Sequence, residues 1–125
     1  MSVERRVEVL QRVFDAFNRH DLDAILACFA EECTFDSPRG PDPWGQRFGG
    51  RDEVRRGLQA RFEGMPDVRY DDGEHFACGS RGVSEWTIRG TTVAGDAVEV
   101  RGCDLWTFDR DDQLIRKDSF WKRRE

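Results

Sequence analysis

The hydrophobic period of this chain changes near residue 66, and that change limits the folds open to it. Before this point apolar residues recur every three to four positions, and after it apolar and polar residues alternate. The first pattern predicts helices and the second predicts strands. Within 125 residues this order is typical of a single α+β domain, residues 1–125, in which helices cover one face of a sheet.

Three helices are expected in the first half of the chain. The first spans residues 3–18, the second begins after the N-cap residue Asp21 and carries Phe29 on its apolar side, and the third runs from Asp52 to about Gly64. Residues 33–36 alternate like a short strand. Residues 37–50 hold three prolines and four glycines, which predicts a long loop.

The second half of the chain predicts an antiparallel meander. Four alternating segments are separated by turn-like sequences, and they are residues 68–78, 82–93, 97–108 and 114–122. The expected element order is therefore α-α-β-α-β-β-β-β.

Composition excludes several classes of partner. A net charge of −5 argues against nucleic acid, because neutralising phosphates requires an excess of lysine and arginine. No apolar run approaches the roughly 18 residues of a membrane span, and four of the first ten residues are charged, so we expect no membrane partner and a cytoplasmic location. The four cysteines and two histidines lack metal-ligand spacing, and no glycine-rich phosphate-binding motif occurs. We therefore expect no metal and no cofactor.

One acidic residue interrupts the apolar side of a predicted strand. In the segment 97–108, Asp104 shares a face with Val98, Val100, Trp106 and Phe108. A carboxylate on an apolar face must pair, accept hydrogen bonds or become neutral. Two explanations follow: a buried aspartate that serves backbone amides or a lysine, or a carboxyl group at the base of an apolar ligand pocket.

Three stretches of the chain resemble the nuclear-transport-factor-2-like (SnoaL-like) superfamily, which includes ketosteroid isomerases, polyketide cyclases, limonene-epoxide hydrolases and scytalone dehydratase. These are residues 9–38, residues 50–58 and the final pair of segments, DLWTF and LIRKDSFWK. The resemblance implies a cone-shaped, cystatin-like barrel open at one end. It also implies a hydrophobic cavity and a homodimer formed through the outer face of the sheet.

The resemblance also suggests which residues could act. Asp104 matches the protonated aspartate of the isomerases, whereas their tyrosine falls on Val13 and their base on Ser37, one residue from Asp36. In the last strand the same pattern directs Lys117 inward and Asp118 outward. The candidate catalytic residues are therefore Asp104, Asp36, His75 and Lys117.

The candidate substrate-binding residues are aromatic or apolar. Trp44 and Phe48 form either a lid over the open end or a plug against the helices, and the remaining candidates line the walls: Phe14, Trp86, Val100, Trp106 and Trp121.

Three functions remain open at this stage. The first is a cofactor-free isomerase, cyclase or lyase that acts on a small hydrophobic carbonyl or polyketide-like compound. The missing tyrosine and base argue against the usual steroid isomerase mechanism. The second is a non-catalytic binding or sensing module for a hydrophobic metabolite, and the third is an interaction protein whose cavity is filled by its own side chains.

Overall fold

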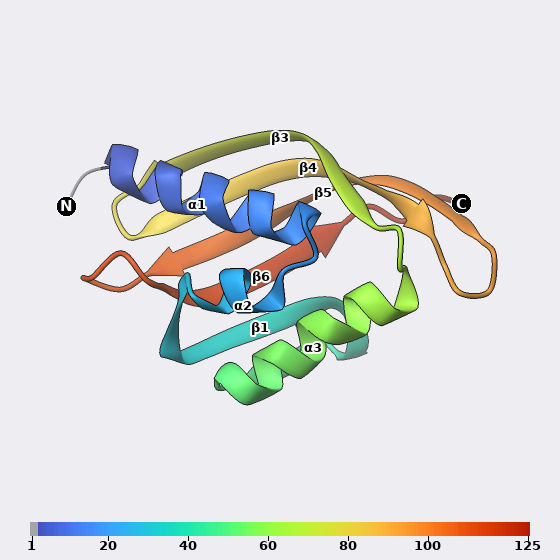
Figure 1. The fold of residues 1–125 in the computed structure, drawn as a ribbon, viewed down its shortest axis with the longest axis horizontal. Helices are drawn as coiled ribbons and strands as arrows, with labels where there is room; N and C mark the ends of the chain where they lie inside the picture. Colours follow the sequence, from blue (N-terminus) through green and yellow to red (C-terminus); the bar gives the residue numbers. More distant parts are fainter. Residues whose placement is uncertain (1–2) are drawn as a thin grey trace.

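The computed structural model describes residues 3–125, which form three helices and one sheet of six strands (Figure 1). The elements are α1 (Val3–Asn18), α2 (Leu22–Leu26), β1 (Phe29–Asp42), β2 (Gly45–Gly49), α3 (Arg51–Gly64), β3 (Arg69–Cys78), β4 (Arg81–Thr91), β5 (Ala97–Phe108) and β6 (Leu114–Trp121).

The strands follow the order β2-β1-β6-β5-β4-β3, and the sheet curves without closing. Strands β3 to β6 form the predicted antiparallel meander, whereas β1 pairs with β6 in parallel. Helix α1 lies across β3 and β4, and α3 lies across β1 and β2. The predicted α+β architecture is confirmed, with one face of the sheet covered by helices and the other free.

The prediction of a loop over residues 37–50 is wrong. Strand β1 continues through this segment to Asp42, turns at Pro43 and Trp44, and returns as β2, so the element order gains a strand. The pairing of β1 with β2 is irregular between Ser37 and Asp42. Prolines are tolerated in such an irregular edge pairing, because no ladder hydrogen bond needs their missing N–H. Phe29 begins β1 and does not belong to the second helix.

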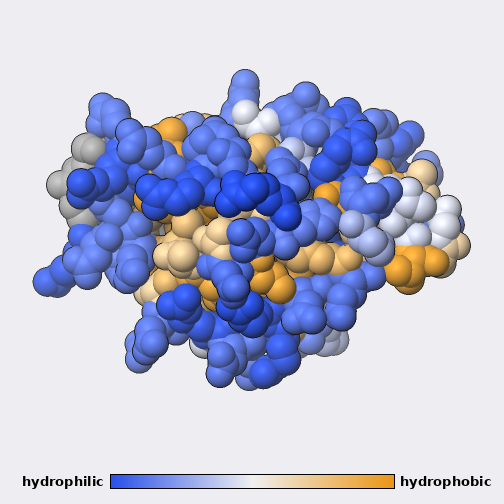
Figure 2. All heavy atoms as spheres, viewed as in Figure 1, coloured by the Kyte–Doolittle hydropathy of each residue, from blue (hydrophilic) through white to orange (hydrophobic). Residues whose placement is uncertain are grey.

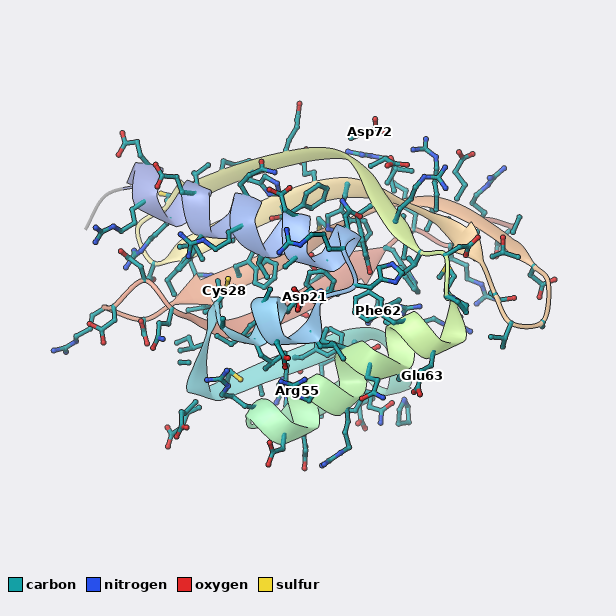
Figure 3. All side chains as sticks on the ribbon, viewed as in Figure 1. Asp21, Cys28, Arg55, Phe62, Glu63 and Asp72 are labelled. Atoms are coloured by element: carbon teal, nitrogen blue, oxygen red, sulfur yellow. The ribbon has the colours of Figure 1, made fainter. Side chains whose placement is uncertain are left out.

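Aromatic side chains fill the space between the helices and the sheet. Phe62 of α3 packs against Phe17 and stacks on His20 at the end of α1, with ring centroids 4.4 Å apart in the latter pair. Figure 3 shows Phe62 on the side of α3 that faces α1. In Figure 2 an apolar area lies between α1 and α3, where Figure 1 places α2, and it is surrounded by hydrophilic residues.

The convex face of the sheet exposes two aromatic residues. Phe76 of β3 and Phe120 of β6 are each half exposed there. This is the face through which the resemblance implies a dimer, and the dimer stays a prediction. None of the helices within residues 3–125 is long and apolar enough to span a bilayer.

Candidate functional site

A row of polar side chains crosses the concave face of the sheet. His75 of β3 lies opposite Ser84 of β4, Ser84 lies opposite Asp104 of β5, and Asp104 lies opposite Ser119 of β6. Opposed side chains on neighbouring strands point to the same side and lie within reach of one another. The strand register therefore assembles four polar groups in a line on a face that is otherwise apolar.

Asp104 is almost fully buried, and other side chains satisfy its carboxylate. Oδ1 accepts a hydrogen bond from Lys117 Nζ at 2.7 Å and another from the hydroxyl of Ser119. Oδ2 accepts a hydrogen bond from the indole nitrogen of Trp86 at 2.9 Å. This arrangement matches the first explanation for the aspartate, because it pairs with a lysine. The neighbouring cavity described below leaves the second explanation open as well.

Lys117 has a more unusual environment than Asp104. It is 4 % exposed, and Nζ also donates a hydrogen bond to Ser119 Oγ at 2.6 Å. Nζ lies 4.9 Å from the centre of the Phe35 ring, with the rings of Phe17 and Trp106 at 5.2 and 5.5 Å. Burial lowers the pKa of Lys117, and the attraction of Asp104 opposes this effect only in part. The amine is therefore closer to releasing its proton than a lysine in water.

Each of the two tryptophans near Asp104 lies opposite a glycine. Trp86 of β4 pairs with Gly102 of β5, and Trp106 of β5 pairs with Gly82 of β4. The Trp86 ring occupies the space that a side chain at position 102 would need, because a Cβ there would lie 2.5 Å from Cζ3 of the indole. The glycine thus lets the indole lie over the neighbouring strand and reach Asp104.

Two small cavities meet at Lys117. One, of about 10 Å³, is lined by Val13, Phe14, Phe17, Tyr70, Ser84, Trp86, Asp104, Trp106 and Lys117. The other, of about 20 Å³ and here called the outer cavity, is bounded by Phe35, Pro38, Leu58, Arg61, Ser119 and Trp121 and shares Phe17, Tyr70, Trp86 and Lys117 with the first, the inner cavity. Each has room for about one water molecule. In this conformation the aromatic side chains themselves fill most of the concave face.

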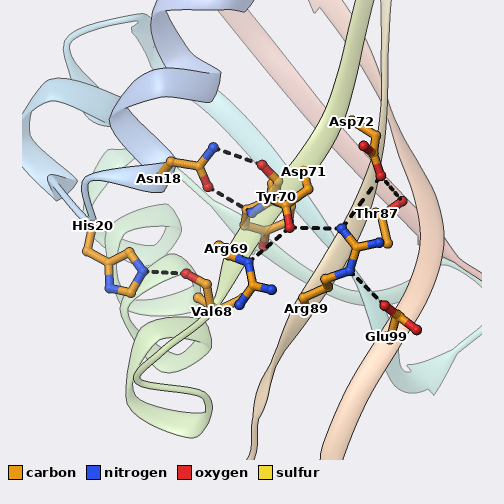
Figure 4. Close-up of polar contacts among 10 residues, drawn as sticks. All are labelled: Asn18, His20, Val68, Arg69, Tyr70, Asp71, Asp72, Thr87, Arg89 and Glu99. Carbon is orange, nitrogen blue, oxygen red and sulfur yellow. Dashed lines mark hydrogen bonds and ion pairs between the residues drawn. The ribbon is translucent and has the colours of Figure 1, made fainter.

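Tyr70 lines both cavities and is held in place by α1. The side-chain amide of Asn18 donates to the carbonyl oxygen of Tyr70 and accepts from its backbone N–H, at 2.9 and 2.7 Å. Figure 4 shows this double hydrogen bond at the start of β3, beside the contact of His20 with the carbonyl oxygen of Val68. Burial raises the pKa of Tyr70, so its hydroxyl stays protonated and can act as a donor.

His75 ends the polar row on the side of α1. Its Nδ1 lies 2.7 Å from Ser84 Oγ, and its ring meets the Phe14 ring edge to face at 4.9 Å. The other ring nitrogen, Nε2, is enclosed and has no hydrogen-bond partner among residues 3–125. Burial lowers the pKa of His75, with Asp15 and Asp104 opposing the shift. His75 is thus held as a neutral imidazole.

We expect His75→Gln to reduce the loss of stability on acidification. Because the pKa of His75 is lower in the folded protein, the unfolded chain binds an extra proton between that pKa and the ordinary value of about 6.5. The free energy of unfolding should therefore decrease as the pH is lowered through this window, by at most about 1.4 kcal/mol per pH unit. Urea denaturation of both proteins at pH values from roughly 5 to 7 measures the slope. Equal slopes in wild type and variant would contradict the assignment.

The structure brings most of the predicted site residues together, with three exceptions. Asp36 is buried on the opposite face of the sheet, where Arg47 binds both carboxylate oxygens at 2.8 and 3.0 Å and Arg116 adds a contact at 3.3 Å. Trp44 is exposed in the β1–β2 turn under the Arg47 guanidinium, so it covers no pocket. Phe48 stacks on Phe35 and packs on α3, as the plug interpretation implies.

The remaining candidates divide between the two cavities and a groove outside them, whose lining includes Pro38, Arg61, Val98, Val100 and Trp121. Trp86, Trp106 and Phe14 line the inner cavity, Trp121 lines the outer one, and Val100 lines only the groove. Sequence reasoning missed Ser84, Ser119, Tyr70 and Arg61 as site residues. The only available signal was strand pairing, since Ser84 and Ser119 both lie opposite Asp104.

Comparison with solved structures places this arrangement among known folds. A protein from Xanthomonas campestris, provisionally described as a polyketide cyclase, is 25% identical with a TM-score of 0.82, over 95% of this chain and 91% of that one. A protein of unknown function from Mesorhizobium loti, described as NTF2-like, is 28% identical with a TM-score of 0.77, over 97% of this chain and 93% of that one. Another NTF2-like protein of unknown function, from Burkholderia pseudomallei, is 24% identical with a TM-score of 0.81, over 98% and 92% of the two chains.

The sequence comparisons define the family. A search among curated proteins found no match. The model of the SnoaL-like domain matches residues 10–117, which include every element from the middle of α1 to the first half of β6. The chain therefore belongs to the SnoaL-like domain family of the nuclear-transport-factor-2-like superfamily.

Proposed function

We propose that the protein is a cofactor-free isomerase, cyclase or lyase that acts on a small, largely apolar carbonyl compound. The observation that carries this proposal is the buried pair of Lys117 and Asp104 at the junction of two cavities with aromatic walls. An acid and a base in contact, shielded from water, can move a proton onto and off a substrate. Isomerisation, aldol-type cyclisation and elimination next to a carbonyl all use such a transfer.

Lys117 would act as the base and Asp104 as the acid, because the two groups share one proton. When Lys117 Nζ passes its proton to Asp104 Oδ1, the pair becomes a neutral amine and a carboxylic acid. The amine then takes the proton from the carbon beside the substrate carbonyl, while the Asp104 carboxyl donates a hydrogen bond to the carbonyl oxygen. The resulting enolate, hydrogen-bonded to the Asp104 carboxyl, either regains the proton at another carbon, attacks a second carbonyl group whose oxygen takes up the proton, or expels a leaving group that takes up the proton. Returning the proton to the substrate or product restores the pair.

A groove provides the route for a substrate to this pair. It has a volume of about 890 Å³ and shares Pro38, Arg61 and Trp121 with the outer cavity. Because the inner and the outer cavity each hold about one water molecule, only the reacting end of a substrate would enter them, after displacing aromatic side chains. The body of the molecule would remain in the groove, against Val98, Val100 and Trp121.

The comparison with the Xanthomonas campestris protein supports this substrate class. That protein is provisionally described as a polyketide cyclase, and polyketide chains carry several carbonyl groups with exchangeable protons between them. The present chain matches it over nearly its whole length. A carbonyl compound of this general type suits both the acid–base pair and the aromatic walls.

Hydrogen–deuterium exchange beside a carbonyl tests the proposal without knowledge of the natural substrate. We expect wild-type protein in D2O to accelerate exchange of the α-protons of small aryl ketones such as acetophenone and 1-tetralone, measured by NMR. General acid–base catalysis contributes roughly 10²–10⁴-fold, so Asp104→Asn/Lys117→Met should slow the exchange at least about 100-fold. Asp118→Asn, which removes a carboxylate from the convex face of the same sheet, should leave it unchanged.

The small cavity volume favours one alternative, a binding module that holds a hydrophobic metabolite without changing it. The chain has Val13 where the isomerases have their tyrosine, and among residues 3–125 no second carboxylate lines the two cavities with Asp104, which also favours this alternative. Under this alternative the aryl ketones bind, but their α-protons exchange at the same rate with wild type and the double variant. The same NMR samples therefore separate the two functions.

A further inference from the structure

The groove that leads to Lys117 is basic, although the chain carries a net charge of −5. Five of its lining residues are cationic, and they are Arg39, Arg61, Lys122, Arg123 and Arg124. The acidic residue in the lining is Glu99, whose carboxylate already accepts a hydrogen bond from Arg89 at 2.7 Å. Positive charge is thus concentrated at the entrance to the site, where it would attract an anionic ligand.

Arg61 is the one of these five cations that also borders the outer cavity. It projects from α3, lines both the groove and the outer cavity, and lies over the ring of Trp121 at 4.4 Å from the ring centre. The outer cavity that it borders also contains Lys117 and Ser119. Arg61 therefore connects the groove to the acid–base pair.

Arg61 also differs from three arginines of the sheet in having no acidic partner among the described residues. Arg47, Arg89 and Arg116 each bind carboxylates, whereas no carboxylate within residues 3–125 pairs with Arg61. Its electrostatic neighbours are Tyr70 and a second cation, Arg39. Burial lowers the pKa of Arg61, and Arg39 adds to that shift. A partly buried cation beside a like charge gains most from an added anion.

We propose that Arg61, assisted by Arg39, binds a carboxylate of the substrate at the mouth of the outer cavity. A guanidinium group binds a carboxylate through two parallel hydrogen bonds, and the contact with the Trp121 ring restrains the Arg61 side chain beside the outer cavity. The substrate class is then an apolar carbonyl compound that also carries a carboxylate. This inference rests on the proposed function, because it assumes that the groove leads substrate to Lys117.

Two probes that differ in one group test the inference. 2-Naphthoate and 2-naphthamide share an aromatic body, but only the former carries a charge, and calorimetric titration gives the affinity of each. We expect wild-type protein to bind 2-naphthoate at least about tenfold more tightly than 2-naphthamide. Arg61→Gln should remove this preference and leave the affinity for 2-naphthamide within about twofold. Arg56→Gln, which removes an exposed cation from the same helix, should preserve the preference.

The outcomes separate this inference from the proposed function. If 2-naphthamide binds and 2-naphthoate binds no more tightly, the carboxylate site is refuted and the acid–base proposal stands. If neither probe binds wild-type protein, the carboxylate site is refuted, and the exchange of ketone α-protons alone decides the proposed function. If Arg61→Gln does not fold, Arg61→Lys replaces it: a retained but reduced preference supports the paired contact, and an unchanged preference refutes it.

Discussion

Asp104→Asn is expected to lower the free energy of unfolding by about 3–5 kcal/mol, the usual result of removing one partner from a buried ion pair. The substitution keeps the size of the side chain but leaves the ammonium of Lys117 without a counter-charge among the rings of Phe17, Phe35 and Trp106. Ser119 is the other polar group that Nζ contacts, and a hydroxyl cannot neutralise the charge. Urea denaturation measures the loss directly.

The double variant Asp104→Asn/Lys117→Met shows whether the loss comes from the unpaired charge. Methionine has nearly the length of lysine and no charge, so the cluster becomes neutral at a similar volume. Replacing a buried ion pair by apolar groups is often neutral or stabilising, and most of the lost stability should therefore return. Asp118→Asn serves as the control on the convex face, where the carboxylate pairs with a half-exposed arginine. A double variant as unstable as Asp104→Asn alone would show that packing, and not charge, holds this cluster together.

This pair of variants also decides between a structural and a catalytic role for Asp104. If the pair only stabilised the fold, the double variant would recover every measurable property of the wild type. If the pair transfers protons, the double variant recovers stability but not the exchange of ketone α-protons. Stability and exchange therefore change independently only if the acid–base proposal is correct.

The sequence contained the information that places Asp104, because alternation is a local property. Apolar side chains two residues apart share a face, so the strand pattern of residues 97–108 was enough to put an acid on the concave side. The inward position of Lys117 could be inferred only through the family resemblance, since apolar residues occur on both sides of β6. The strand periodicity and the family resemblance together therefore predicted that Asp104 and Lys117 lie on the concave face of the sheet.

The parts that the sequence did not reveal depend on pairing between distant segments. Tyr70 and Arg61 enter the site because α1 and α3 pack on the same sheet, and nothing near either residue in the chain indicates this. The β1–β2 hairpin was missed because its prolines and glycines are typical of loops. Pro38 and Pro41 lie in the irregular stretch of the β1–β2 pairing between Ser37 and Asp42, whereas Gly45 and Gly49 pair with Asp42 and Thr34. Local composition cannot distinguish the two cases.

The largest packing effect near the site is expected from Gly102→Ala. A Cβ at this position would lie 2.5 Å from the Trp86 ring and 2.6 Å from the carbonyl oxygen of Phe120, and both distances are too short for a real contact. Overpacking of this kind costs about 1–3 kcal/mol. Moving the Trp86 ring would also break its hydrogen bond to Asp104, and a hydrogen bond to a charged group contributes about 1.5–3 kcal/mol. We therefore expect a total loss of about 3 kcal/mol or more, measured by urea denaturation.

Gly49→Ala is the matched control, because Gly49 also lies in a strand and has no atom within 4 Å of the position its Cβ would take. That substitution should change stability by at most about 0.5 kcal/mol. The indole N–H resonance of Trp86 reports on the mechanism, since it should shift in Gly102→Ala and stay in place in Gly49→Ala. A fully stable Gly102→Ala protein with an unshifted resonance would mean that the indole does not lie over Gly102. A group other than Trp86 would then have to hold the Asp104 carboxyl in position. Equal destabilisation by both substitutions would instead point to a general intolerance of the sheet toward added side chains.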